Sequence, residues 1–141
     1  MLLATLLAGV PALAAAAPAM EFANAWVRAT PPGQSVAAAY GILRNRSNVA
    51  DRLLAATSPQ AASVEAHVTE LVNGVYQMRD SDLRVPAGAQ TTLEPEGSHL
   101  MVMGLKGPLR PGDRLTVILR FAKAGLVRVD IPVRPASATG P

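Results

Sequence analysis

Short runs of alternating apolar and polar residues, each closed by a turn signal, constrain this fold most. The clearest example is "SVEAHVTELVNGVYQM" at residues 63–78, where two alternating runs meet at Asn73-Gly74. An Asn-Gly pair between such runs is the strongest local signal for a two-residue β-hairpin turn. No helical period is sustained after residue 20. We therefore expect this part of the chain to be built from strands.

Similar runs recur along the rest of the chain and are separated by residues that favour turns. Examples of these turn signals are Pro31-Pro32-Gly33, Ser58-Pro59, Pro86-Ala87-Gly88 and Pro95-Glu96-Gly97. Eight or nine short strands at this spacing predict one all-β domain, either a β-sandwich or a Greek-key barrel. The expected strands cover residues 22–28, 36–44, 53–57, 63–72, 75–78, 114–121 and 126–133, with two more inside 91–105.

The N-terminal segment has a different composition, because "LLATLLAGVPALAAAA" is apolar and rich in alanine and is followed by Pro18-Ala19. This pattern predicts a signal peptide over residues 1–19, cleaved after Ala17 or Ala19, although no Lys or Arg precedes Arg28. A membrane anchor is the alternative, but the run is shorter than the roughly 20 residues that a span needs. We expect an exported, periplasmic protein without stable membrane insertion after processing. Its mature domain would cover residues 20–135, with a loose tail at 136–141.

Composition excludes several functional classes. The 13 basic residues are scattered and only 4% of residues are aromatic, so nucleic-acid binding is not expected. The chain has no cysteine, which excludes a disulfide, a thiolate nucleophile, a cysteine-based zinc or iron–sulfur site and a blue-copper centre. We find no nucleophile–base pair and no paired carboxylates at useful spacing. We therefore expect that the chain is not an enzyme.

The stretch "GSHLMVMGL" at residues 97–105 is the most informative candidate site. It places His99, Met101 and Met103 at every second position, so a strand would present all three on one face. The chain has only one other histidine, His67, and both histidines lie in segments that also carry methionine.

The hairpin supplies a second pairing of the same kind. A two-residue turn at Asn73-Gly74 sets Thr69 opposite Met78 and His67 opposite Asp80. His67 and Met78 are then diagonal neighbours, with backbones about 7–8 Å apart. Local geometry alone therefore predicts two pairs, each with one imidazole and one thioether. Whether the two pairs meet depends on the tertiary fold.

Two imidazoles and two thioethers form a neutral, soft donor set. Such donors favour Cu(I), whereas zinc prefers thiolate, imidazole or carboxylate and calcium prefers oxygen. Without a cysteine ligand, we expect copper carriage by ligand exchange rather than electron transfer. Haem ligation fits poorly, because covalent c-type attachment needs cysteine. The alternative from another class is a β-sandwich interaction or adhesion module without metal, in which the His/Met cluster serves only for packing.

The spacing of His67, ten residues, Met78, twenty residues and His99-Leu100-Met101 resembles the H-x10-M-x21-H-x-M signature of the PCu(A)C family of periplasmic copper chaperones. The likeness extends to "AWVRATPPG", "NGVYQMR", "VPAG" and "FAKAGLVRVDIPV". It implies a cupredoxin-like β-sandwich and a monomer that holds Cu(I) with His67, Met78, His99 and Met101. It also implies delivery to the CuA site of cytochrome c oxidase, with Sco-type partners.

Two further residues belong to the candidate site. Met103 shares the face of His99 and Met101 but lies outside the signature, so we expect it to be a wall of the site rather than a ligand. Glu65 precedes His67 by two residues on the same face. It is interpreted either as a group that orients the imidazole or as a solvated carboxylate. The spacer between Met78 and His99 is one residue short of the signature, and we expect the difference to lie in the loop "RDSDLRVPAG".

Overall fold

A computed structural model describes residues 9–12, 18–80 and 83–141, although the side chains of residues 78–80 are outside the description. The described part of the chain contains strands and no helix. The strands are β1 (Met20–Arg28), β2 (Val36–Asn45), β3 (Asp51–Thr57), β4 (Ala61–Val72), β5 (Val75–Asp80), β6 (Arg84–Val85), β7 (Gln90–Leu93), β8 (His99–Leu105), β9 (Arg114–Phe121) and β10 (Gly125–Arg134).

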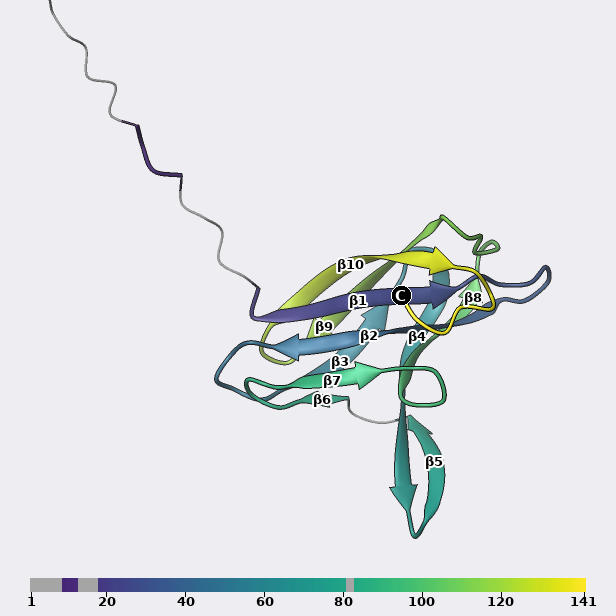
Figure 1. Cartoon of the computed structure of the whole chain (residues 1–141), viewed down its shortest axis with the longest axis horizontal. Helices are drawn as coiled ribbons and strands as arrows, with labels where there is room; N and C mark the ends of the chain where they lie inside the picture. The colour runs from purple at the N-terminus through teal and green to yellow at the C-terminus, as the bar shows by residue number, and fades with distance from the viewer. Residues whose placement is uncertain (1–8, 13–17, 81–82) are drawn as a thin grey trace, which may run out of the picture.

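Seven of these strands close into a barrel in the order β4-β8-β2-β1-β10-β9-β3 among the described residues. The barrel closes because β3 also pairs with β4, with Ala56 opposite Val64. Three strands extend this framework: β5 pairs with β4, β6 with β3 and β7 with β2. Figure 1 shows the β4–β5 hairpin projecting away from the barrel. The prediction of an all-β, cupredoxin-like barrel is confirmed.

Strand alternation decides which side chains of β4 and β8 enter the core. On β8, Leu100 and Val102 are fully buried members of the core cluster. On β4, Val64 is also buried in that cluster. Because successive side chains of a strand point to opposite sides of the sheet, His99 and Met101 lie on the outer face of the barrel. The candidate ligands therefore do not belong to the hydrophobic core.

Close approach between β1 and β2 depends on a glycine. The register between these strands shifts between Ala23 and Trp26, and Asn24 has a φ of 51° at this bulge. A Cβ added at Gly41 would lie 2.5 Å from Cε2 of Phe22 and 3.0 Å from Cα of Ala25. Only glycine leaves room for the Phe22 ring at this point.

The expected strands agree closely with the observed ones. The predicted strand at 114–121 has the bounds of β9, and the other strands differ by a few residues at their ends. Sequence reasoning missed β6, which has only two residues and forms by pairing Asp51 and Arg52 with Val85 and Arg84. So short a strand carries no alternation to recognise, and tertiary pairing alone creates it.

The two ends of the domain are described in part. Of the expected signal peptide at 1–19, residues 1–8 and 13–17 lie outside the described residues. Among the described residues, no helix has the length and apolarity needed to cross a membrane. At the other end, Nε of Arg28 donates a hydrogen bond of 2.9 Å to the carbonyl oxygen of Ala138. This bond joins Ala138, within the segment 136–141, to the end of β1.

Candidate metal centre

The pairing of β4 with β8 brings the two histidines together. His67 and His99 are direct partners in this antiparallel pair. Their ring centroids lie 5.4 Å apart, with the ring planes inclined by 65°. The hairpin register alone placed His67 only beside Met78, so the contact between the imidazoles comes from the tertiary fold.

His99 presents one ring nitrogen with a free lone pair. Its Nδ1 lies 3.0 Å from the carbonyl oxygen of Gly97. A carbonyl oxygen can only accept a hydrogen bond, so Nδ1 carries the proton and Nε2 of the neutral ring is left as an acceptor. Nε2 is buried and has no hydrogen-bond partner. Unpaired buried polar atoms are unfavourable unless something binds them, and a metal ion satisfies such a nitrogen directly.

His67 shows a similar arrangement with its nitrogens exchanged. Its Nε2 lies 3.5 Å from Oε2 of Glu65, and its Nδ1 is buried without a hydrogen-bond partner. A carboxylate on one ring nitrogen orients the imidazole and leaves the other nitrogen available to a metal. The contact favours the first of the two interpretations of Glu65, although its side chain remains 43% exposed.

The thioethers extend the same face of the sheet. Met101 follows His99 by two residues, pairs with Glu65 on β4 and with Ala38 on β2, and is half-buried. On β5, the backbone of Met78 pairs with Thr69, as the hairpin register predicts. The side chain of Met78 lies outside the described residues. The backbone therefore places the four residues of the signature around one area of the outer face.

Met103 lies further along β8 from the histidines. It pairs with Ser63 on β4 and with Val36 on β2, and its side chain is half-buried. Met101 lies between it and His99 on the same face. This position is consistent with a wall of the site.

Aromatic side chains of β1 and β2 flank His99 on the side away from β4. The sequence analysis did not assign them to the site. The rings of Tyr40 and His99 meet edge to face with centroids 6.4 Å apart. Trp26 packs on Tyr40 with centroids 4.7 Å apart, and the guanidinium of Arg28 lies over both rings at 5.8 and 5.7 Å. Tyr40 therefore borders the His99 ring, which is buried, and Trp26 and Arg28 pack behind Tyr40. The only sequence signal for this row of side chains is one aromatic residue on each of two neighbouring strands, Trp26 on β1 and Tyr40 on β2. These two positions pair in the structure.

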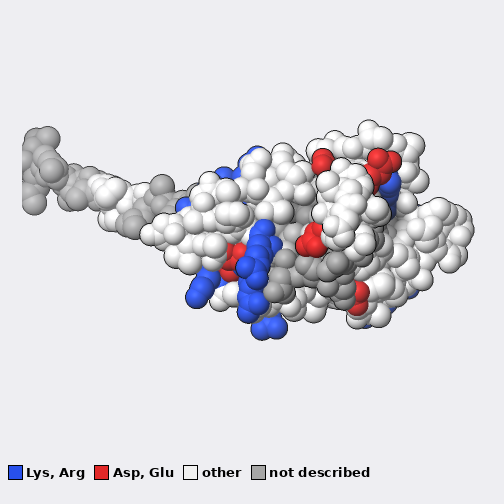
Figure 2. All heavy atoms as spheres, turned by 90° about the horizontal axis from the view of Figure 1, so that it is seen from below, with Lys and Arg blue, Asp and Glu red and all other residues white. Residues whose placement is uncertain are grey.

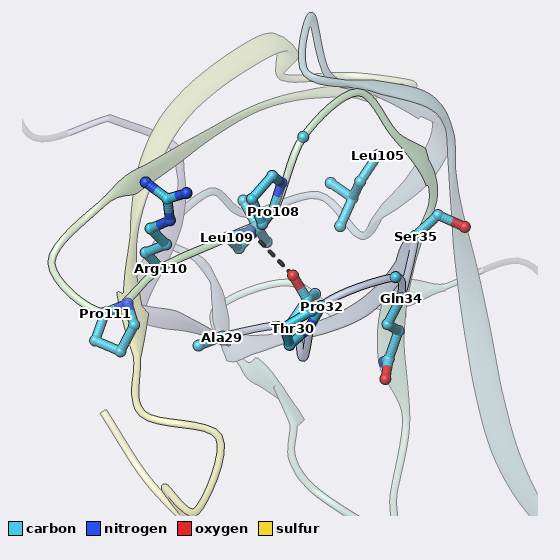
Figure 3. Close-up of a pocket in the computed structure, with 12 residues that line it drawn as sticks. Ala29, Thr30, Pro32, Gln34, Ser35, Leu105, Pro108, Leu109, Arg110 and Pro111 are labelled. Carbon is cyan, nitrogen blue, oxygen red and sulfur yellow. Dashed lines mark hydrogen bonds between the residues drawn. The ribbon is translucent and has the colours of Figure 1, made fainter.

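Two cavities lie beside the 29–35 loop, which joins β1 to β2. The smaller, of about 330 Å³, adjoins the site because Met101, Tyr40 and Arg28 line it. The larger, of about 640 Å³, lies between the 29–35 loop and the 105–111 loop (Figure 3). A hydrogen bond from the backbone N–H of Leu109 to Oγ1 of Thr30 joins these loops. Among the described residues that line the larger cavity there is no histidine, methionine or carboxylate, so its size does not make it the metal site.

Comparison with known proteins places the chain in a family. The family model described as "Putative lipoprotein LpqE-like" matches residues 20–133. This chain belongs to the LpqE-like family. A curated relative, "Putative lipoprotein Lxx21020" of Leifsonia xyli subsp. xyli (strain CTCB07), is 38% identical over 120 residues, which are 84% of this chain and 71% of the relative.

Solved structures similar to this LpqE-like chain are PCuAC domains and a related protein. The copper-bound PCuAC domain from PmoF2 is 26% identical, with a TM-score of 0.72 over 86% of this chain and 97% of that one. Apo-DR1885 from Deinococcus radiodurans is 30% identical, with a TM-score of 0.64 over 100% of this chain and 97% of that one. The Cu(I) form of DR1885 is 28% identical, with a TM-score of 0.63 over 82% of this chain and 80% of that one. The resemblance to the PCu(A)C family is thereby confirmed.

Proposed function

We propose that this protein is an exported copper chaperone that carries Cu(I) on the outer face of its barrel. The observation that carries the proposal is the contact between His67 and His99, whose rings lie 5.4 Å apart with one unpaired, buried nitrogen on each. The similar PmoF2 domain has a copper-bound structure and DR1885 has a Cu(I) form. Copper is thus the cargo that both the donor chemistry and the relatives favour.

The proposed ligands are His67, Met78, His99 and Met101. Nδ1 of His67 and Nε2 of His99 would bind the ion, because the other nitrogen of each ring faces Glu65 or Gly97. Among the described residues, no three His, Asp or Glu side chains gather in a group that could hold a metal. The thioethers of Met78 and Met101 are the further donors in the proposed set, and thioethers favour Cu(I) over zinc or calcium.

A chaperone must also release its metal. Neutral ligands hold a monovalent ion without a strong charge attraction, so an acceptor can displace them one at a time. We propose the CuA site of cytochrome c oxidase as the acceptor, with a Sco-type protein as a partner, and the periplasm as the compartment. The apolar leader at residues 1–19 supports export, and the "lipoprotein" descriptions of the family and of the curated relative agree with a place in the cell envelope. Carriage requires no catalytic step and no second subunit.

The test is a Cu(I) titration against a competing chelator, with three variants of β8. We expect one equivalent of tightly bound Cu(I) for the wild type. His99→Ala and Met101→Leu each remove a proposed ligand. Each should weaken Cu(I) binding by more than the roughly 10- to 100-fold that is typical when a residue supporting a ligand is removed. Met103→Leu is the matched control on the same face and should bind as the wild type does. Unchanged affinity in the first two variants would favour the interaction module without metal.

A further inference from the structure

The β4–β5 hairpin ends in apolar side chains that the fold leaves in solvent. Leu71 is 61% exposed, Val75 60% and Tyr76 76%. These are three of the eight large hydrophobic residues that are exposed in the described part of the chain. Figure 1 shows that the hairpin stands clear of the barrel. The core therefore does not explain why this tip is apolar.

The register of the hairpin assigns two of these residues to the face of the metal centre. Leu71 pairs with Tyr76, two positions along from the pair of Thr69 with Met78. His67 lies a further two positions along β4, so all these residues share one face. Four residues of strand separate Leu71 from His67, a distance of about 13 Å. Val75 pairs with Val72 and lies on the opposite face.

The surface of the tip is also nearly uncharged. Glu70 is the only charged residue between positions 69 and 77. On the face that Figure 2 shows, seen from below the view of Figure 1, a group of basic side chains lies toward the side from which the N-terminal segment extends. Exposed apolar patches mark surfaces that bind proteins or membranes, and a tip with a single charged residue, which is acidic, does not attract anions.

Copper transfer requires an acceptor to cover this face. Ligand exchange brings the ligands of the acceptor into contact with the ion, so the acceptor must lie against the strands that carry His67 and His99. A specific interface buries about 800 Å² on each partner, which is a patch roughly 30 Å across. Such a patch, centred on the histidines, reaches Leu71 and Tyr76. Tyrosine is also one of the residues that most often dominate binding energy at interfaces.

We propose that Leu71 and Tyr76 form a docking pad for the copper-accepting protein, which presents an uncharged, apolar rim around its own soft-metal ligands. The proposal rests on the proposed chaperone function and adds the surface on which transfer takes place. Apolar docking predicts a transfer rate that depends weakly on salt, because screening acts on charged contacts.

The experiment measures the rate of Cu(I) transfer from the loaded protein to the apo CuA domain of cytochrome c oxidase and to an apo Sco-type protein. The test variant is Leu71→Ser combined with Tyr76→Ser, and Val75→Ser is the control on the other face of the same hairpin. We expect the double variant to transfer copper at least about 10-fold more slowly and the control to match the wild type. Cu(I) affinity and transfer to a small chelator, which needs no docking, should be unchanged in both.

Each other outcome overturns a defined part of the proposal. If the wild type transfers copper and the double variant transfers it equally fast, the docking pad is overturned and the chaperone function still stands. Equal slowing by Val75→Ser overturns the assignment to the metal face. Loss of Cu(I) affinity in the double variant shows that these residues shape the metal site instead. Tight Cu(I) binding by the wild type without transfer to either acceptor overturns the proposed delivery and the pad together.

Discussion

Nδ1 of His99 lies 3.0 Å from the carbonyl oxygen of Gly97, only two residues earlier in the chain. The residues just before β8 therefore orient the ring, and one of them, Glu96, adopts a φ of 66°. Its Nε2 is left free and buried before any ligand binds. Preorganisation of this kind reduces the ordering cost of binding an ion at the proposed metal centre.

Cu(I) should raise the melting temperature of the protein. The ion would join β4 to β8 in the folded state, and the unfolded chain does not hold the two histidines together. At a free concentration about 1,000 times the dissociation constant, the expected stabilisation is about 4 kcal/mol. Thermal unfolding followed by circular dichroism checks this, with a Cu(I) chelator to reverse the shift and Zn²⁺ as the comparison ion. Equal stabilisation by both ions would contradict a soft, thioether-containing site.

Removing the carboxylate beside His67 should weaken Cu(I) binding. Glu65→Ala deletes the acceptor that lies 3.5 Å from Nε2 of His67, and loss of an outer-shell partner costs roughly 10- to 100-fold in affinity. Glu65→Gln keeps an oxygen acceptor without the charge, so a smaller loss is expected. Chelator competition measures both variants. Glu70→Ala, on the opposite face of the same strand, is the control for charge, and a loss of the same size there would refute the orienting role.

Asp51 should make the fold sensitive to acid. Burial raises the pKa of this carboxyl, but hydrogen bonds from the backbone N–H groups of Ala124, Lys123 and Arg52 lower it, and the net pKa falls below its ordinary value of 3.8. A lowered folded-state pKa means that the carboxylate stabilises the fold fully above the unfolded value. That contribution is lost as the pH falls through the folded value.

The variant Asp51→Asn tests this linkage. It places an amide NH₂ group against backbone N–H donors, so we expect a loss of roughly 1–3 kcal/mol at neutral pH. Its stability should also fall less steeply than that of the wild type between about pH 5 and pH 2. Urea unfolding across this pH range gives both quantities. Parallel curves for the two proteins would rule out Asp51 as the source of the acid sensitivity.

Gly41→Ala should destabilise the barrel. The new Cβ would lie 2.5 Å from the Phe22 ring and 3.0 Å from the backbone of Ala25, and overpacking of this kind costs about 1–3 kcal/mol. Gly107→Ala is the matched control, because a Cβ there meets nothing within 4 Å. Chemical denaturation of both variants is the measurement. If the two substitutions cost the same, Phe22 has room to move and the close packing of β1 on β2 is not essential.

The sequence by itself determined the local geometry of both halves of the site. Asn73 and Gly74 both adopt positive φ angles, 51° and 79°, and a two-residue turn of this type locks the strands into one register. The pairing of Thr69 with Met78 could therefore be predicted and was found. The common face of His99 and Met101 followed from strand alternation alone.

Only the tertiary structure decided that the two halves meet. His67 and His99 are separated by 31 residues, and nothing local specifies that β4 pairs with β8 rather than with another strand. Closure of the barrel sets that pairing, because it must bury Val64, Leu100 and Val102 together on the inner side. The same closure brings Tyr40 against His99. Short-range backbone preferences extend over one turn or one strand, whereas strand order depends on how the whole chain buries its apolar faces.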